Sequence, residues 1–139
     1  PAHVKEKVAP PPNGDALLIN PRTEAPMTFL LLDIRDTFLL YPTAKKETRE
    51  WERARYTIEV LKLNENDVLP EARKEAYHSY IARLKEYIQD QKHGNTTAHL
   101  VNALKRMQHP TVWHEMKRQQ SRIPSLRELF SDAPAALGW

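Results

Sequence analysis

The sequence contains no cysteine and only three glycines among its 139 residues. Without cysteine the chain has no disulfide, no thiolate-bound zinc or iron–sulfur cluster, and no cysteine nucleophile. Phosphate-binding loops and dinucleotide-binding turns need several glycines close together, and these three are far apart in the sequence. No serine is flanked by glycine, as the nucleophile of a serine hydrolase would be. The sequence alone therefore excludes several large classes of enzyme.

Long apolar runs are also absent, since the longest, around residues 29–32, is four residues. A membrane-spanning helix needs roughly 18 or more apolar residues in a row, so we expect no membrane association. The first residue is Pro1, and the residues after it lack the basic-then-apolar pattern of a signal peptide. We therefore expect a cytoplasmic chain that begins downstream of a natural N-terminus.

Positive charge is in modest excess, because 21 basic and 18 acidic side chains give a net charge of +3. The whole excess comes from residues 96–139, which hold six basic residues against three acidic ones. This bias is weaker than the dense basic stripe of a dedicated nucleic-acid-binding protein, but it predicts phosphate contacts in the last third of the chain. The six basic residues are Lys105, Arg106, Lys117, Arg118, Arg122 and Arg127.

The first 42 residues carry short apolar runs separated by prolines and turn residues. Residues 1–15 contain three consecutive prolines and an Asn-Gly pair, and we interpret them as a linker from a missing upstream domain. The apolar residues 16–19 precede an Asn-Pro pair, which predicts either a short buried strand or an extended segment that fills the core. Residues 29–32 and 37–41 fit the two strands of a hairpin. A helix over 28–41 is the alternative, and the threonine and aromatic content favours the hairpin.

From residue 46 onward, apolar residues recur at the helical spacing of three and four. Trp51 and Leu61 belong to the first stripe, and Asn64 can end this helix in the left-handed conformation. A second, longer stripe ends at Gly94. The sequence therefore predicts a mainly α fold with a small β-hairpin, in which residues 16–139 form a single domain of four to five helices. The expected strand and hairpin region covers 16–42, and the expected helices cover 46–63, 66–93, 96–108, 111–121 and 125–131.

Histidines and carboxylates are numerous, but their spacing forms no recognisable metal site or acid–base pair. His109 and His114 are five residues apart with Pro110 between them, and Arg118 occupies the second histidine position of the zinc motif HExxH. The acidic residues of the expected helices alternate with lysine and arginine, as on a solvated helix face. We therefore expect no metal, cofactor or small-molecule ligand in this chain.

Two tryptophans and one arginine have less obvious roles. Trp113 can be either a core residue or a partner contact. Trp139 ends a weakly apolar tail, where an exposed tryptophan would be an apolar liability, so it either folds back or docks elsewhere. Arg22 follows Asn20 and a proline, and we favour structural anchoring of this loop over contact with a ligand.

Three segments together resemble the region C-terminal to the nuclease motif in a family of bacterial HNH endonuclease-like proteins. They are ALLINPR at 16–22, RARYTIEVLKLN at 53–64 and ARKEAYHSYIARLKEYI at 72–88. The resemblance covers residues 16–92, and residues 109–139 more loosely. Members of this family often pair with an ATPase in anti-phage defence cassettes, such as Septu-type and retron-associated systems.

The resemblance implies that a ββα-metal nuclease core, which uses a divalent metal and often carries zinc-binding CxxC pairs, precedes the matched region. The histidine–asparagine–histidine core and its cysteines are missing from this chain. No catalytic residue of the family is therefore carried onto it. We expect four residues of the matched region to act as structural anchors, namely Asn20, Arg22, Arg55 and Asn64.

The function implied by the resemblance is that of a non-catalytic helical accessory domain of an HNH endonuclease-like defence protein, which docks an ATPase partner, positions DNA, or does both. The alternative is a stand-alone nucleic-acid-binding module that uses the basic C-terminal third. A small enzyme with an unrecognised site is the least favoured hypothesis. The expected contacts with DNA or a partner are Lys105, Arg106, Trp113, Lys117, Arg118, Arg122 and Trp139.

Overall fold

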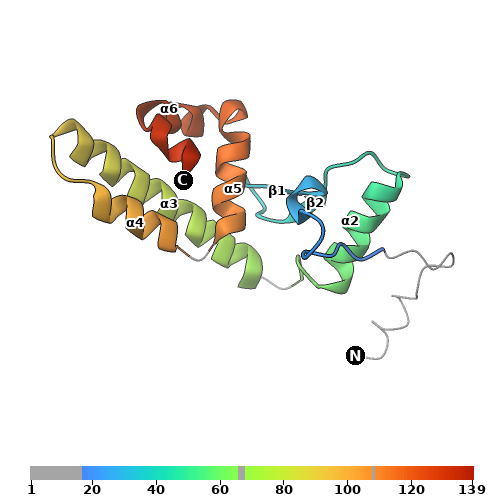
Figure 1. The fold of residues 1–139 in the computed structure, drawn as a ribbon. Helices are drawn as coiled ribbons and strands as arrows, with labels where there is room; N and C mark the ends of the chain where they lie inside the picture. Colours follow the sequence, from blue (N-terminus) through green and yellow to red (C-terminus); the bar gives the residue numbers. More distant parts are fainter. Residues whose placement is uncertain (1–16, 66–67, 108) are drawn as a thin grey trace. The chain divides into compact units, whose positions relative to one another are not determined.

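The computed structural model describes the chain except for residues 1–16, 66–67 and 108, so the linker expected over 1–15 lies outside the described residues. Five α-helices, one two-stranded antiparallel sheet and short 3₁₀ turns make up the described part (Figure 1). The predicted mainly α fold with a small β-hairpin is thus confirmed. Of the helices in the described part, none combines the length and apolar character needed to cross a bilayer.

The chain divides into two compact units, Pro1–Pro70 and Glu71–Trp139, which we call unit 1 and unit 2 and describe separately. Unit 1 contains the hairpin and the first α-helix, and unit 2 contains most of the longest helix and the three that follow. The single domain expected over 16–139 stays a prediction.

Unit 1 is built around the β-hairpin. Strands β1 (Leu30–Leu32) and β2 (Leu40–Pro42) pair antiparallel, so that Leu32 lies opposite Leu40, and both of these side chains are buried. The prediction of a hairpin rather than a helix over 28–41 is confirmed, although both strands are shorter than expected. Such a small sheet has little stability of its own and needs other elements to cover it.

The carboxylate of Asp33 organises the turn between the strands. It accepts a hydrogen bond from the Thr37 hydroxyl at 2.8 Å, and the backbone amides of Arg35, Asp36 and Thr37 also donate to it. Partial burial raises the pKa of Asp33, but these hydrogen bonds outweigh it and hold the pKa below its ordinary value. Phe38 then takes a positive φ of 55°. Because the turn uses Thr37 and Phe38, β2 begins later than the sequence predicts.

In the described part of the apolar segment before Asn20, residues 17–19 form no strand, and Ile19 is buried whereas Leu18 is 40% exposed. Ile19 is only 2% exposed, and its backbone N–H donates to the Thr57 hydroxyl of helix α2 (Arg49–Val60) at 3.0 Å. The short strand expected over 16–19 is therefore wrong for the described residues, and the core-filling alternative holds for Ile19 alone, while Ala16 lies outside the described residues. The buried amide has a side-chain partner in place of a neighbouring strand.

Helix α2 begins where the Thr48 hydroxyl accepts a hydrogen bond from the Trp51 amide at 3.2 Å, which is a standard N-cap. Its buried residues are Ala54 and Thr57. Leu61, which the sequence places on the buried stripe, is 53% exposed. This expectation is wrong because the helix ends at Val60 and the chain turns before another residue joins its buried face.

The end of α2 is a Schellman motif. Lys62 has a positive φ of 52°, its N–H donates to the Glu59 carbonyl, and the Leu63 N–H donates to the Ile58 carbonyl. The left-handed stop expected at Asn64 is therefore wrong, since Lys62 holds that position. Asn64 instead contacts the hairpin through its side chain.

Unit 2 contains most of α3 (Val68–Lys92) together with α4 (Ala98–Arg106), α5 (Pro110–Gln119) and α6 (Pro124–Asp132). Helix α4 doubles back along α3, and α5 crosses it (Figure 1). Its largest fully buried side chains include Tyr80 and Leu84 of α3 and Phe130 of α6. Each bound of the described helices, α2 included, lies within three residues of its expected position. Two 3₁₀ turns, η2 (Gln120–Arg122) and η3 (Pro134–Gly138), follow α5 and α6.

Glycine and proline set the boundaries of these helices. Gly94 has a positive φ of 72° and follows α3, where the Asn95 N–H donates to the Asp90 carbonyl in a second Schellman motif. Pro110 and Pro124 each lie in the first turn of a helix, where a missing N–H costs nothing. These residues therefore fix the short connections that bring α4, α5 and α6 back to α3.

Candidate nucleic-acid interface

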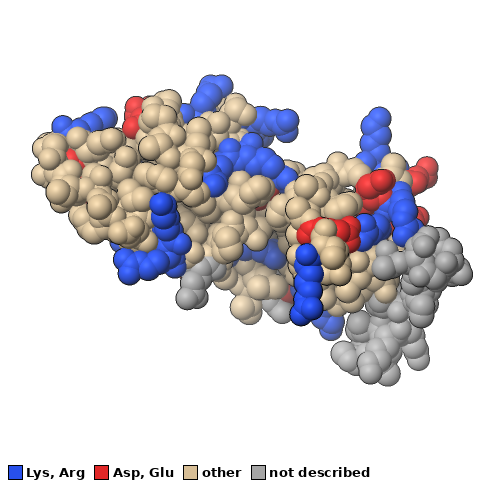
Figure 2. Space-filling model, in the orientation of Figure 1, with Lys and Arg blue, Asp and Glu red and all other residues tan. Residues whose placement is uncertain are grey.

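The basic residues of the last third lie mainly at the C-terminal ends of helices. Lys105 and Arg106 occupy the last turn of α4, Lys117 and Arg118 occupy the last turn of α5, and Arg122 belongs to η2. Figure 2 shows lysine and arginine side chains over the end of α4 and over α5, with few acidic ones nearby on this face. Cations at helix C-termini also interact favourably with the helix dipole, so their position has a structural benefit as well.

Lys105 and Arg106 form an exposed basic pair. The Arg106 Nε donates to the Asn102 carbonyl at 3.2 Å, which directs the guanidinium back along its own helix. Lys105 lies at the edge of a small hollow of about 190 Å³ whose other lining residues include Trp113 and Trp139. This pair can therefore contact an anion without giving up a buried interaction.

Trp113 and Trp139 form an internal contact. The Trp113 indole N–H donates to the main-chain carbonyl oxygen of Trp139 at 3.1 Å, and the Lys117 ammonium donates to the same oxygen at 2.6 Å. The Trp139 ring meets the Tyr87 ring edge-on, with centroids 4.9 Å apart. Of the alternatives for Trp139, the structure has it folded back against unit 2.

The Trp113 ring is surrounded by other side chains. Its centroid lies 5.1 Å from that of Tyr80 and 5.6 Å from that of Phe130, and the Lys117 ammonium lies 5.8 Å from it. Trp113 is half-buried, so it contributes more to the packing of unit 2 than to a surface on which a base could stack. Lys117 contacts this cluster through the Trp113 ring and through its hydrogen bond to Trp139.

The charge of Arg118 is paired with a buried carboxylate. Glu115 is fully buried on α5, its Oε1 lies 2.6 Å from the Arg118 guanidinium, and the Gln119 amide donates to its Oε2. A buried carboxylate is very unfavourable without such partners. Arg118 therefore neutralises Glu115 and adds little net positive charge to the surface.

Sequence reasoning missed Glu115. Its position offered a signal, because it lies between Val112 and Met116 at the spacing of a buried helix face, where both neighbours are buried. An acidic residue on such a face predicts an ion pair with a cation three or four residues away.

In unit 1 the structural anchor expected at Arg55 is instead Arg53, which connects α2 to the segment before it in the sequence. The Arg53 guanidinium forms two hydrogen bonds of 2.6 Å to the Glu24 carboxylate, and it also donates to the carbonyls of Leu17 and Leu18. Arg55 is 60% exposed, and its ion pair is with Glu59 on the same helix at 3.5 Å. The expectation for Arg55 is wrong because the two arginines, two positions apart on a helix, point to nearly opposite sides.

The loop at Asn20 is closed by its own polar groups. The Asn20 side-chain oxygen accepts a hydrogen bond from the Arg22 amide at 3.0 Å, and the Glu24 carboxylate accepts one from the Asn20 amide at 3.1 Å. The hydrogen bond from Arg53 and the one from the Asn20 amide together lower the pKa of Glu24 to about 2. Arg22 contributes its backbone to this loop, and its side chain is exposed.

Asn64 ties the end of α2 to the hairpin. Its side-chain oxygen accepts a hydrogen bond from the Leu40 amide at 2.8 Å, and its side-chain amide donates to the Leu40 carbonyl at 2.7 Å. Both main-chain groups of this strand residue are thereby satisfied by one side chain, as a neighbouring strand would satisfy them.

The titratable residues do not form a metal site in the described residues, since no three His, Asp or Glu side chains come together there. The comparisons with family models, with curated proteins and with solved structures each found no match. The functional proposal therefore depends on the residues themselves and on the resemblance of the three segments.

Proposed function

We propose that the chain is a non-catalytic helical accessory domain of an HNH endonuclease-like defence protein, which positions DNA through its basic surface and docks an ATPase partner. The defence role and the ATPase are supported by the resemblance of the three segments. The contact with DNA is supported by the distribution of exposed charge in unit 2.

The distribution of charge within residues 96–139 is the observation that carries the DNA-binding part. Of the three acidic residues in this range, Glu115 is buried, and Glu128 and Asp132 are both on α6. The ends of α4 and η2 therefore expose Lys105, Arg106 and Arg122 without an acidic residue of this range beside them in the sequence. Such a surface fits the phosphate backbone, which is bound largely without regard to sequence.

The alternative, a stand-alone module that stacks bases on tryptophan, receives less support. The indole N–H of Trp113 and the ammonium of Lys117 are both hydrogen-bonded to Trp139. We therefore expect binding to duplex DNA that depends on phosphate contacts, with no preference for single strands. A preference for single-stranded DNA that is lost in Trp113→Leu would favour the alternative.

The test compares two adjacent pairs of basic residues. We expect the chain to bind a fluorescent DNA duplex at about 50 mM salt and to lose most of this affinity by about 200 mM. Lys105→Gln with Arg106→Gln should reduce the slope of log affinity against log salt by roughly 2, because two phosphate contacts are lost. Fluorescence anisotropy titrations measure both quantities.

The matched control is Lys45→Gln with Lys46→Gln, an exposed pair in unit 1 that should leave DNA binding unchanged. Equal effects of the two pairs would assign the binding to net charge alone and contradict the proposed surface. Cleavage of DNA by this chain with Mg²⁺ or Mn²⁺ would contradict the non-catalytic role.

A further inference from the structure

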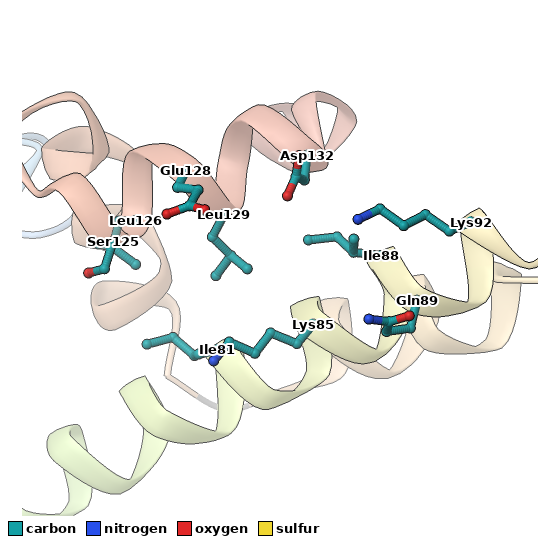
Figure 3. Close-up of a pocket in the computed structure, with 10 residues that line it drawn as sticks. All are labelled: Ile81, Lys85, Ile88, Gln89, Lys92, Ser125, Leu126, Glu128, Leu129 and Asp132. Atoms are coloured by element: carbon teal, nitrogen blue, oxygen red, sulfur yellow. The ribbon is translucent and has the colours of Figure 1, made fainter.

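Helices α3 and α6 of unit 2 enclose an open groove of about 500 Å³ (Figure 3). Its floor is apolar and comes from both helices. Ile88 and Leu126 are buried in it, whereas Ile81 and Leu129 are only partly covered and line the open space. The groove therefore presents apolar surface that the described part of unit 2 leaves accessible.

The two walls of the groove carry charges of opposite sign. Lys85 and Lys92 line it from α3, and Glu128 and Asp132 line it from α6. All four are exposed, and Figure 3 shows Lys92 extending across the open side toward α6. The groove is thus basic along one edge and acidic along the other.

We propose that this groove binds an amphipathic helix of a protein partner. The apolar stripe of that helix would pack on Ile81 and Leu129, with acidic residues on the flank that faces α3 and basic residues on the flank that faces α6. This mode of recognition uses apolar anchors at i, i+3 or i+4, and i+7. The proposal rests on the proposed function only in that an accessory domain needs a protein partner.

The length of the groove fits this occupant. Ile81 and Ile88 are seven residues apart on α3, which corresponds to about 10 Å along the helix axis. Two turns of a bound helix span the same length and present anchors at i and i+7. Lys85 and Lys92 have the same separation but begin four residues further along α3, so the basic edge runs beside the half of the apolar floor that includes Ile88 and continues beyond it.

The charges argue against other kinds of ligand. The phosphates of a nucleic acid would be repelled by Glu128 and Asp132, and a purely cationic segment would be repelled by Lys85 and Lys92. A ligand that satisfies both edges must carry acidic groups on one side and basic groups on the other, with an apolar surface between them. An amphipathic helix with segregated flanks has this arrangement.

The test uses two synthetic helical peptides of identical composition. The first has a leucine stripe with glutamates along one flank and lysines along the other, and the second has glutamate and lysine alternating on both flanks. We expect the full 139-residue chain to bind the first roughly tenfold more tightly in fluorescence anisotropy, because several edge charges contribute together. The variant Lys85→Glu with Lys92→Glu, in which both edges are acidic, should lose this preference.

The control variant is Lys74→Glu with Arg83→Glu, which makes the same change of charge at exposed positions of α3 that do not line the groove. It should keep the preference for the first peptide. Equal binding of both peptides, or binding of neither, overturns the proposal. A dimer that dissociates in the Lys85→Glu, Lys92→Glu variant would identify a second copy as the occupant and also overturn it. Because these titrations contain no DNA, their outcome is separate from that of the DNA-binding test.

Discussion

Different kinds of contact stabilise the interior of each of the two units. In unit 1, polar side chains join segments far apart in the sequence, as when Thr57 holds Ile19 and Asn64 holds Leu40. In unit 2, buried side chains such as Leu84 and Phe130 pack helices against each other. Helices satisfy their own backbone groups, so apolar contact between them is sufficient, whereas short strands and extended segments need partners for their amides.

The comparison predicts that unit 2 is most sensitive to the loss of apolar volume. Leu84 is fully buried on α3, and Leu84→Ala should lower the free energy of unfolding by about 2–5 kcal/mol, through lost burial and the cavity left behind. Urea denaturation followed by circular dichroism measures this change. The matched control is Glu86→Ala, two residues away and exposed, which should change stability by less than about 0.5 kcal/mol. Equal effects of the two substitutions would contradict an apolar basis for the stability of unit 2.

Unit 1 should instead be sensitive to the loss of a single polar side chain. Asn64→Ala removes both hydrogen bonds to Leu40 and leaves the main-chain amide and carbonyl of Leu40 without these partners. The free energy of unfolding should fall by about 1–3 kcal/mol. Hydrogen exchange of the Leu40 amide should become faster in the variant. The control is Asn102→Ala on α4, an exposed asparagine of unit 2. If the Leu40 amide exchanges at the same rate in both variants, Asn64 does not hold the hairpin.

The same difference explains how much of the molecule could be predicted from sequence. The helices of unit 2 were predicted because local patterns determine them, as with the apolar stripe of α3 and the glycine that follows it at Gly94. The Arg53 contact with Glu24 could not be predicted, because it depends on which side of α2 faces a segment 29 residues away. Arg53 lies four residues before Thr57 on the same face of α2, and the hydrogen bond from Ile19 to Thr57 shows that the N-terminal segment lies on that face.

In the candidate interface, too, contacts that depend on the folded structure could not be predicted from the sequence. The sequence locates the excess of basic residues in the last third of the chain, and the structure places four of them in the last turns of α4 and α5. It could not show that Lys117 is hydrogen-bonded to Trp139 or that Arg118 pairs with buried Glu115, since both contacts require the folded helices. The cations that form no such internal contact are therefore a subset of those counted from composition, and the proposed DNA contact is assigned to Lys105, Arg106 and Arg122 of this subset on the basis of sequence neighbours.

The smallest expected effect concerns the dependence of unit 1 on pH. The pKa of Glu24 falls from 4.5 to about 2, chiefly through its hydrogen bond with Arg53. Because the folded-state pKa lies below the unfolded value, the contact stabilises the fold above about pH 4.5, and this contribution is lost as the pH falls toward 2. The stability difference between the native chain and Glu24→Gln should therefore be larger at about pH 6 than at about pH 3.

Thermal unfolding at the two pH values measures this difference, and the second pair of α2 provides the control. Glu59 is 50% exposed and meets Arg55 at 3.5 Å, so Glu59→Gln should have a small effect at both pH values. If Glu24→Gln and Glu59→Gln respond to pH in the same way, the Arg53 contact is no more than a surface ion pair. If the pH dependence of stability changes in Glu24→Gln alone, Arg53 stabilises the contact between α2 and the segment that contains Glu24.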